Sequence, residues 1–532
     1  MATIAHVPLI LIRGFGGLNV EDERRVAYQG FNEGTVYPHK RGENYIYEGL
    51  ILKYLKSNWR YHDATNVVGY YGAPVVDDRE LPAELRALDR AYFTGHRVVI
   101  DPGTALDLLA TREDPARSLW VFRYYDLDDR RFRVYGEALV RLIDFVRDLT
   151  SLKSGGSKPP VNIIAHSMGG LIVREALQCT LPALGRRGSD CFNKIVTLGT
   201  PHKGISFQAI RDWTLVEGEE ELERFNPDAQ ADPAVAWSYV NLARHFPPER
   251  ILTIVGTNYR SYTVRAATLL NRLFSTPQEF GLNYNRSDGL VKQEAAQLPG
   301  SPRTFVHKCH GGYDSLVTAR ESFEIATRFF HGDVSVRVNL VRARVKRGFD
   351  HFGRSEMFFG MSVKPRRVDF ELFHQSGEAE NCYGPFRTAD FSDDLTARRG
   401  FEWAGPDRLI WEGWLDTSRI TPAGVERVRP EEQRDLVMRL DFYVGERDLL
   451  GVGFSDNVIF RKQYYIRALA AAGRTLADSL DDVKLFLYRD ENFADTAHAD
   501  ELTRRDGLWT FTIEGTGFVG ELGLRLDRVA DR

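Results

Sequence analysis

The chain has 532 residues, enough for two or more domains, each with a substantial core. Its 70 Lys and Arg residues nearly balance its 74 Asp and Glu residues, so charge argues against nucleic acid or an anionic membrane surface as the partner. Four cysteines are too few for a disulfide framework. Cys179 and Cys191 would pair if the protein is exported, whereas free buried thiols are expected otherwise.

The amino end carries no basic segment of the kind that begins a signal peptide. No window approaches about 20 uninterrupted apolar residues, the length that a transmembrane helix requires. We therefore expect a soluble protein, cytoplasmic or secreted, with no transmembrane segment.

The apolar run 7–12 predicts a short buried strand that leads into the glycine-rich loop Arg13-Gly14-Phe15-Gly16-Gly17. Such a loop can turn backbone N–H groups toward a neighbouring site, where they would stabilise a developing oxyanion. The glycines lack the G-x-G-x-x-G spacing, and no helical pattern follows at once, which argues against a dinucleotide site. The N–H of Phe15 is the first candidate oxyanion donor.

Short apolar strands alternate with amphipathic helices over the first 332 residues. This alternation predicts a mostly parallel sheet covered by helices on both faces. The clearest strands and helices are 118–125, 161–165, 194–198 and 250–255 for strands, and 135–150 and 169–180 for helices.

One of these strands, 161–165, runs through His166 into Ser167 and then into a helix. This is the pattern of a nucleophile elbow, in which a strained turn between small residues exposes a serine hydroxyl above the sheet. Ala165 replaces the first Gly of the usual G-x-S-x-G, and Gly169 keeps the second. A tight turn with a surface serine is the structural alternative. We predict Ser167 as the nucleophile and the N–H of Met168 as the second oxyanion donor.

A serine nucleophile needs a base, and the base needs a carboxylate to orient it. Asp288 lies in a polar, glycine-containing loop, and His310 precedes a Gly-Gly loop and a helix predicted over 313–331. His307 is the rival base, at the end of a predicted strand over 304–307. We favour His310, since loops carry catalytic groups more often than strand interiors do.

These motifs together resemble the bacterial lipase and esterase branch of the α/β-hydrolase superfamily over residues 1 to about 332. The matching segments are 11–16 for the oxyanion loop, 165–170 for the elbow, 287–291 for the acid loop, His310 for the base, and 198–204 for the T-P-H-x-G turn of lipases and of glycosylphosphatidylinositol-deacylase-like proteins. The resemblance implies an α/β-hydrolase fold and a triad in the order Ser, Asp, His. Arg13 departs from the family, which usually has His there.

Between strands, residues 203–248 change character, with acidic residues among aromatic ones. Lipases place a cap or lid at this point, so Trp213 and Phe225 are expected to line an acyl-binding wall. An additional layer of core packing is the alternative. His166 and His202 are expected to be structural.

No metal or cofactor is predicted to be required. Asp126, Asp128 and Asp129 lack the glycine and distal glutamate of an EF-hand, and the cysteines have no C-x-x-C spacing. Because some lipases of the resembled branch bind calcium or zinc, a structural ion of either kind stays open.

The remaining residues, 333–532, have a different pattern: apolar and polar residues alternate along several short segments. Repeated amphipathic strands of this kind predict an antiparallel β-sandwich. The predicted strands are 334–341, 367–373, 435–444, 483–488 and 508–513, and one helix is predicted over 468–480. This half shows no catalytic constellation, so we expect it to stabilise the hydrolase or to dock it onto bulky substrates or a membrane periphery.

The sequence as a whole predicts a serine carboxylic-ester hydrolase, an esterase or lipase, that acts on ester or lipid substrates through an acyl-enzyme. A phospholipase, a glycolipid deacylase or an acyltransferase would use the same triad. A catalytically silent hydrolase fold that serves as a binding scaffold is the alternative outside enzymes.

Overall fold

The structure is a computed structural model. It describes the following residues: 6–14, 47–57, 61–64, 68–70, 81–94, 98–100, 102–122, 124, 129–205, 218–261, 286–346, 355–366, 368–386, 390–391, 408–417, 437–448, 457–470, 476–491 and 498–529. The chain forms two compact units, the first comprising residues 1–275, 281–302 and 308–323, and the second comprising 276–280, 303–307 and 324–532. The predicted boundaries at residue 332 and around the cap stay predictions.

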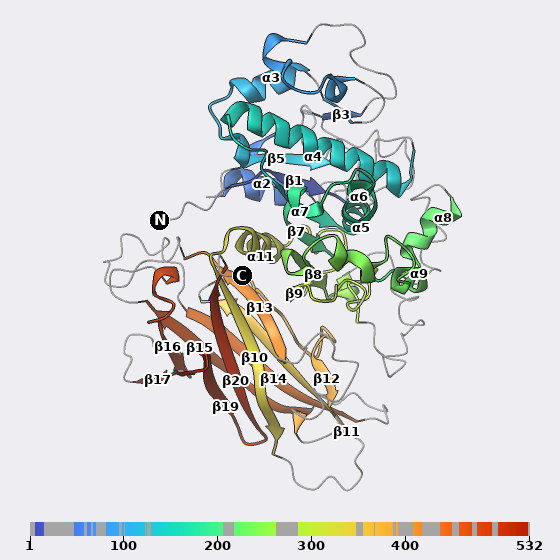
Figure 1. The fold of residues 1–532 in the computed structure, drawn as a ribbon. Coiled ribbons are helices and arrows are strands. Elements are labelled where there is room, and N and C mark those ends of the chain that lie inside the picture. The colour runs from blue at the N-terminus through green and yellow to red at the C-terminus, as the bar shows by residue number, and fades with distance from the viewer. Residues whose placement is uncertain are drawn as a thin grey trace. The chain divides into compact units, whose positions relative to one another are not determined.

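A seven-stranded sheet, of order β2-β5-β1-β6-β7-β8-β9, organises the amino-terminal part of the chain (Figure 1). The paired strands from β2 to β8 run parallel. Every residue of β1, β5, β6 and β8 is buried, as expected for a parallel sheet covered on both faces. The strands are β1 (Leu9–Ile12), β2 (His62–Asp63), β5 (Ser118–Phe122), β6 (Val161–His166), β7 (Phe192–Leu198), β8 (Ile251–Gly256) and β9 (Arg303–Val306).

Helices connect these strands, and the longest, α4 (Phe132–Ser154), lies along the sheet beside β5 (Figure 1). It buries an apolar stripe and ends at Gly155, whose left-handed φ of 66° suits a glycine. The other described α-helices of this part are α2 (Glu48–Lys56), α3 (Pro102–Ala110), α5 (Met168–Glu175), α6 (Leu181–Ala183), α7 (Gly188–Cys191), α8 (Glu219–Leu222), α9 (Pro227–Ala231) and α11 (Arg320–His331). A π-helical turn covers Ala176–Thr180, and β3 (Val68–Tyr70) forms a short antiparallel pair with β4 (Val98–Ile100). This parallel sheet with its helices confirms the predicted α/β fold class.

Short helices fill the described part of the connection from β7 to β8, including a 3-10 helix over Tyr239–Arg244. Phe225 there is 2% exposed and packs against Phe132 of α4, with ring centroids 5.9 Å apart. Phe246 packs against Phe192 of β7 in the same way. These two rings belong to the core, which is the alternative that the sequence left open to an acyl-binding wall. Trp213 lies outside the described residues.

Polar contacts fasten the same connection to α5. The buried guanidinium of Arg174 donates to the carbonyl of His202 at 2.8 Å and to Oε1 of Gln230 at 2.8 Å. The carboxylate of Glu175, 3% exposed, pairs with Arg224 at 2.6 Å. Because a buried charge is costly unless paired or hydrogen-bonded, these contacts hold residues 224–230 against the helix that follows the elbow.

Two antiparallel sheets form the carboxy-terminal part, of orders β13-β10-β20-β19-β18 and β12-β11-β14-β15-β16-β17. Their facing sides are aromatic: Phe518 of β20 packs against Phe359 of β11 and Phe460 of β15. This packing makes the predicted β-sandwich. The strands are β10 (Val334–Val345), β11 (Ser355–Pro365), β12 (Tyr383–Phe386), β13 (Leu409–Leu415), β14 (Val437–Asp448), β15 (Asn457–Leu469), β16 (Lys484–Tyr488), β17 (Asp500–Glu501), β18 (Thr503–Arg505), β19 (Leu508–Glu514) and β20 (Phe518–Arg528).

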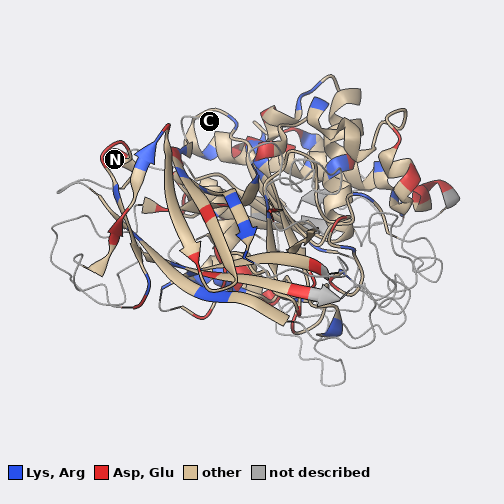
Figure 2. Ribbon diagram, turned by 90° about the horizontal axis from the view of Figure 1, so that it is seen from below, with Lys and Arg blue, Asp and Glu red and all other residues tan. Residues whose placement is uncertain are grey.

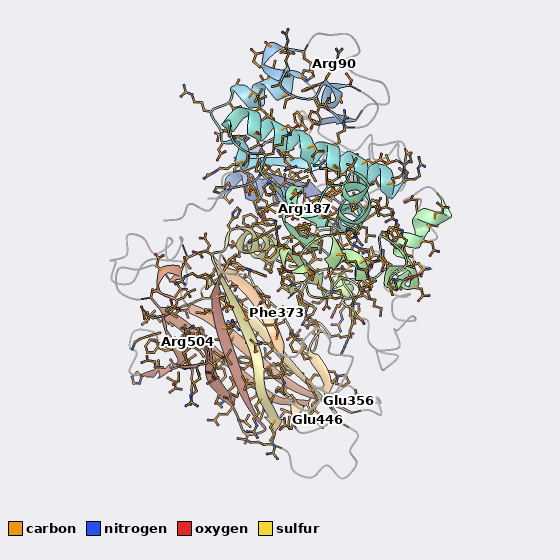
Figure 3. The ribbon with its side chains drawn as sticks, in the orientation of Figure 1. Arg90, Arg187, Glu356, Phe373, Glu446 and Arg504 are labelled. Atoms are coloured by element: carbon orange, nitrogen blue, oxygen red, sulfur yellow. The ribbon has the colours of Figure 1, made fainter. Side chains whose placement is uncertain are left out.

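The strand predicted over 367–373 is wrong. Its described residues form a loop whose backbone pairs with β11 in an isolated bridge between Val363 and Phe373. Phe373 is labelled in Figure 3. Phe370, Leu372 and Phe373 are all buried, so two consecutive side chains point into the core and the alternation of a strand is broken.

Two predicted helices also differ from the structure. Ala468 and Leu469, expected to begin a helix over 468–480, end β15 and pair with Leu485 and Lys484 of β16. Strand pairing overrides the helix propensity of an alanine-rich segment. The helix expected from residue 313 begins at Arg320, because the preceding residues form turns in which the Thr318 hydroxyl donates to the carbonyl of Tyr313.

Charged side chains of both signs are interspersed over the described elements (Figure 2). All four cysteines are free thiols, so Cys179 and Cys191 do not pair in this structure. Among the described helices, none is long and apolar enough to cross a membrane.

Candidate active site

Ser167 lies at the turn between β6 and α5. Its φ of 53° and ψ of −126° fall in a region that non-glycine residues rarely adopt. The two glycines that follow are needed because other loops approach closely. A Cβ on Gly169 would lie 2.8 Å from the carbonyl oxygen of Arg13, and one on Gly170 would lie 2.2 Å from Oγ1 of Thr200. The turn has the geometry of a nucleophile elbow.

His310 and Asp288 meet Ser167 in one continuous series of hydrogen bonds. Nε2 of His310 lies 2.9 Å from Oγ of Ser167, and Nδ1 lies 2.8 Å from Oδ2 of Asp288. The His310 residue is 4% exposed and Asp288 is 1% exposed. In this arrangement the carboxylate holds the proton on Nδ1, so that Nε2 is free to accept the serine proton.

The second carboxylate oxygen of Asp288 is held by backbone. Its Oδ1 accepts hydrogen bonds from the N–H groups of Leu290 and Val291, at 3.0 and 2.7 Å. The N–H of His310 donates to the carbonyl of Asp288 at 2.9 Å. These bonds fix the carboxylate and the base loop in one orientation, as a preorganised site requires.

The ends of β7 and β8 make room for this pair with glycines. Gly199 has a φ of 54°, and a Cβ there would lie 2.8 Å from Oδ2 of Asp288 and 3.1 Å from Nδ1 of His310. A Cβ on Gly256 would lie 2.6 Å from the Cβ of Asp288. Only glycine allows the strand ends to approach the acid and base this closely.

His307, the rival base, belongs to a different cluster. Its ring lies beside that of His374, with ring centroids 5.1 Å apart. Among the described residues, it is the imidazole of His310 that bonds Ser167 and Asp288.

The predicted oxyanion donors lie partly within the described residues. Met168 opens α5, so its N–H has no acceptor four residues earlier in the helix. Phe15 lies outside the described residues, but Gly14 before it packs on the elbow. A Cβ on Gly14 would lie 2.7 Å from the Cβ of Ser167. The glycine-rich loop therefore starts directly against the nucleophile.

His166 and His202 are both buried and both hydrogen-bonded. His166 Nε2 lies 2.9 Å from the carbonyl oxygen of His310, and His202 Nε2 lies 3.1 Å from Oγ1 of Thr197. The pKa of His166 lies well below its usual value, mainly because the ring is buried and secondly because His310 is close to it. The pKa of His202 is also well below its usual value, mainly because of burial and secondly because of the positive charge of Arg174. Both rings are neutral in the folded protein near pH 7.

Because of these two histidines, we expect the protein to lose stability as the pH becomes acidic. Because their folded pKa values are depressed, the unfolded chain takes up their protons first as the pH falls below about 6.5. The free energy of unfolding then drops by up to about 1.4 kcal/mol per pH unit for each histidine, whereas above pH 7 this contribution is fully present. Urea unfolding between pH 7.5 and 5 measures the slope.

His202→Gln should make that slope shallower, because one group that titrates only in the unfolded chain has been removed. His498→Gln, at an exposed position, is the matched control and should leave the slope as in the wild type. Equal slopes for wild type and His202→Gln would contradict the prediction.

Metal-ligating groups do not gather in the part of the chain that the structure describes: no cluster of three or more His, Cys, Asp or Glu side chains there could hold an ion. Asp129 pairs with Arg131, and Asp126 and Asp128 lie outside the described residues.

Sequence reasoning assigned no role in the site to two residues that contact its nucleophile or the residue before it. Thr200 donates its hydroxyl to the carbonyl of Ser167 at 2.9 Å, and the T-P-H-x-G turn that contains it pointed to this position without assigning a contact. The hydroxyl of Tyr47 lies 2.5 Å from Nδ1 of His166. Tyr47 is 119 residues away in sequence, and no local pattern marks it.

The chain is similar in part to a known family. Residues 90–245 match the model described as a PGAP1-like alpha/beta domain. This match, together with the seven-stranded parallel sheet, confirms the α/β-hydrolase fold that the motifs resemble. Ser167 lies inside the matched residues, and Asp288 and His310 lie beyond them.

Comparison with curated proteins finds none that matches this chain. Among solved structures, Bacillus licheniformis lipase BlEst2 in mature form is 13% identical, with a TM-score of 0.31, over 61% of this chain and 92% of that one. Legionella pneumophila phospholipase PlaB in complex with thio-NAD is 11% identical, with a TM-score of 0.29, over 93% of this chain and 91% of that one. A metagenomic carboxyl esterase is 16% identical, with a TM-score of 0.26, over 40% of this chain and 66% of that one.

Proposed function

We propose that this protein is a serine carboxylic-ester hydrolase, an esterase or lipase, in which Ser167 is the nucleophile, His310 the general base and Asp288 the residue that orients it. The observation that carries the proposal is the unbroken pair of hydrogen bonds from Oγ of Ser167 through His310 to Asp288, 2.9 and 2.8 Å long. The structural alternative, a tight turn with a surface serine, does not require a buried imidazole next to the hydroxyl or a buried carboxylate bound to that imidazole. A catalytic triad requires both.

The acylation step follows from these positions. Oγ of Ser167 attacks the ester carbonyl carbon as its proton passes to Nε2 of His310. The carbonyl oxygen becomes an oxyanion, which the N–H groups of Met168 and Phe15 stabilise. The tetrahedral intermediate collapses, the bond to the alcohol oxygen breaks, and His310 returns its proton to that oxygen. The acyl group is then an ester of Ser167.

Deacylation repeats the same steps with water. His310 removes a proton from a water molecule as its oxygen attacks the acyl carbon, and the released Ser167 recovers a proton from the imidazolium. Asp288 orients the imidazole throughout, because its Oδ1 is held by two backbone N–H groups and its Oδ2 faces Nδ1. The same acyl-enzyme would serve a phospholipase, a glycolipid deacylase or an acyltransferase, which differ in the acyl donor or acceptor.

A partitioning experiment tests this proposal. Hydroxylamine competes with water for an acyl-enzyme, so the ratio of hydroxamic acid to free acid is set after the leaving alcohol has departed. Phenyl and p-nitrophenyl butyrate should therefore be turned over and should give the same ratio. A ratio that changes with the leaving group would mean direct attack by water, and the absence of turnover would leave a hydrolase fold that only binds.

A further inference from the structure

A second series of hydrogen bonds passes behind the nucleophile and joins three loops of the site. The N–H of Gly14 lies 2.8 Å from the hydroxyl of Tyr47, that hydroxyl lies 2.5 Å from Nδ1 of His166, and Nε2 of His166 lies 2.9 Å from the carbonyl oxygen of His310. The series therefore runs from the glycine-rich loop, through the residue before the nucleophile, to the backbone of the base. All four residues belong to the first compact unit.

The chemistry of the two ends decides where every proton lies. The carbonyl oxygen of His310 can only accept, so Nε2 of His166 carries a proton. Burial holds the pKa of His166 well below its usual value, so the ring is neutral and Nδ1 is an acceptor. Tyr47 must then donate its hydroxyl proton to Nδ1, and its oxygen accepts the N–H of Gly14. Each member of the series is satisfied in one direction only.

Packing also joins the start of the glycine-rich loop to Tyr47 and His166. A Cβ on Gly14 would lie 2.8 Å from Nδ1 of His166, so this glycine rests on the imidazole. The guanidinium carbon of Arg13 lies 5.9 Å from the centre of the Tyr47 ring, and Nε of Arg13 donates to the carbonyl of Gly14 at 3.1 Å. Arg13, where the resembled branch usually has His, thus contacts Tyr47 from its ring face.

We propose that Tyr47 and His166 are positioning residues that fix Gly14, where the predicted oxyanion loop begins, against the base loop that carries His310. This inference rests on the proposed ester hydrolysis. Tyr47 and His166 form hydrogen bonds to Gly14 and to the main chain of His310, and the ring of His166 also packs beside the ring of His310, with centroids 4.9 Å apart. The pair acts through Gly14, which precedes the predicted oxyanion donor, and through the main chain of His310.

The first test is Tyr47→Phe, which removes only the hydroxyl and leaves the ring against Arg13. Gly14 N–H and His166 Nδ1 both lose the Tyr47 hydroxyl, so Gly14, where the glycine-rich loop begins, is no longer tied to His166. We expect kcat for p-nitrophenyl butyrate to fall about 10- to 100-fold per folded molecule, because small misplacements of stabilising groups carry losses of that order. KM should change little, because the oxyanion contact forms mainly in the transition state.

Tyr464→Phe is the matched control, because its hydroxyl also accepts a backbone N–H, that of Glu514 at 3.1 Å, but within the β-sandwich. It should have wild-type kcat. If Tyr47→Phe is as active as Tyr464→Phe, at the same folded fraction by circular dichroism, the inference is overturned and the proposed function stands. If the wild type shows no turnover that depends on Ser167, the proposed function and this inference fall together.

Two substitutions of His166 separate the two halves of the series. His166→Asn can keep an acceptor near the place of Nδ1, and His166→Gln can keep a donor near the place of Nε2. If Tyr47 acts through His166, adding Tyr47→Phe should lower kcat further in the Asn variant but hardly at all in the Gln variant, where that bond is already lost. Equal further losses in both variants would show that Tyr47 acts independently of His166, and would overturn the proposed series.

Discussion

Ser167→Ala is expected to lower kcat by about 10⁶, and His310→Ala by a similar amount, since nucleophile and base act as one unit in such triads. The reason is the 2.9 Å contact between Oγ and Nε2: without either atom, no activated nucleophile remains. Steady-state kinetics on p-nitrophenyl butyrate measure the loss, and circular dichroism checks that the variants are folded. The double variant should be no slower than either single one.

His307→Ala is the informative comparison for the base, because sequence reasoning left the two histidines as rivals. The ring of His307 packs beside that of His374, whereas the ring that bonds Ser167 and Asp288 is that of His310, so the loss of His307 should leave kcat near the wild-type value. Loss of turnover in His307→Ala with wild-type turnover in His310→Ala would reverse the assignment of the base.

Asp288→Asn is expected to lower kcat by about 10⁴ while the protein stays folded. Oδ1 of Asp288 accepts from two backbone N–H groups, so in the variant the amide oxygen takes that position and the NH₂ group faces Nδ1 of His310. The imidazole must then carry its proton on Nε2, the tautomer that cannot accept the proton of Ser167.

The matched comparison is Asp314→Asn, which removes a carboxylate that pairs with Lys308 at 2.6 Å in the same loop region. Its pair is partly exposed, and such pairs contribute little to stability, so kcat should stay near that of the wild type. A small effect of Asp288→Asn, comparable to that of Asp314→Asn, would show that Asp288 only shapes the loop.

The parts of the candidate site that are formed by residues adjacent in sequence could be predicted from the sequence. The elbow at Ser167 and the loop at Asp288 each depend on a few neighbouring residues, whose small side chains and turn-forming groups are visible in the sequence. The parallel sheet was also predictable, because its strands are continuous apolar runs. The structure brings Ser167, Asp288 and His310 together, as the order of the motifs implied.

Contacts between distant segments were not predictable in this way. Tyr47 contacts His166, which is 119 residues away in sequence. A single tyrosine forms no sequence pattern from which such a contact could be predicted. The segment ending at Phe373 alternates in sequence like a strand, yet its described backbone pairs with β11 in an isolated bridge. Ala468 and Leu469 have helical propensity, but the neighbouring strand β16 decides their conformation. In each case tertiary partners outweigh local preference.

The most direct test of the central claim is to find which serine is activated. A fluorophosphonate reacts with a serine hydroxyl only when a base deprotonates it and donors stabilise the resulting oxyanion. After incubation of the full chain and proteolysis, mass spectrometry should locate the adduct on the peptide that carries Ser167, and His310→Ala should remain unlabelled. An unlabelled wild type, or an adduct on another serine that persists in Ser167→Ala, would contradict the account.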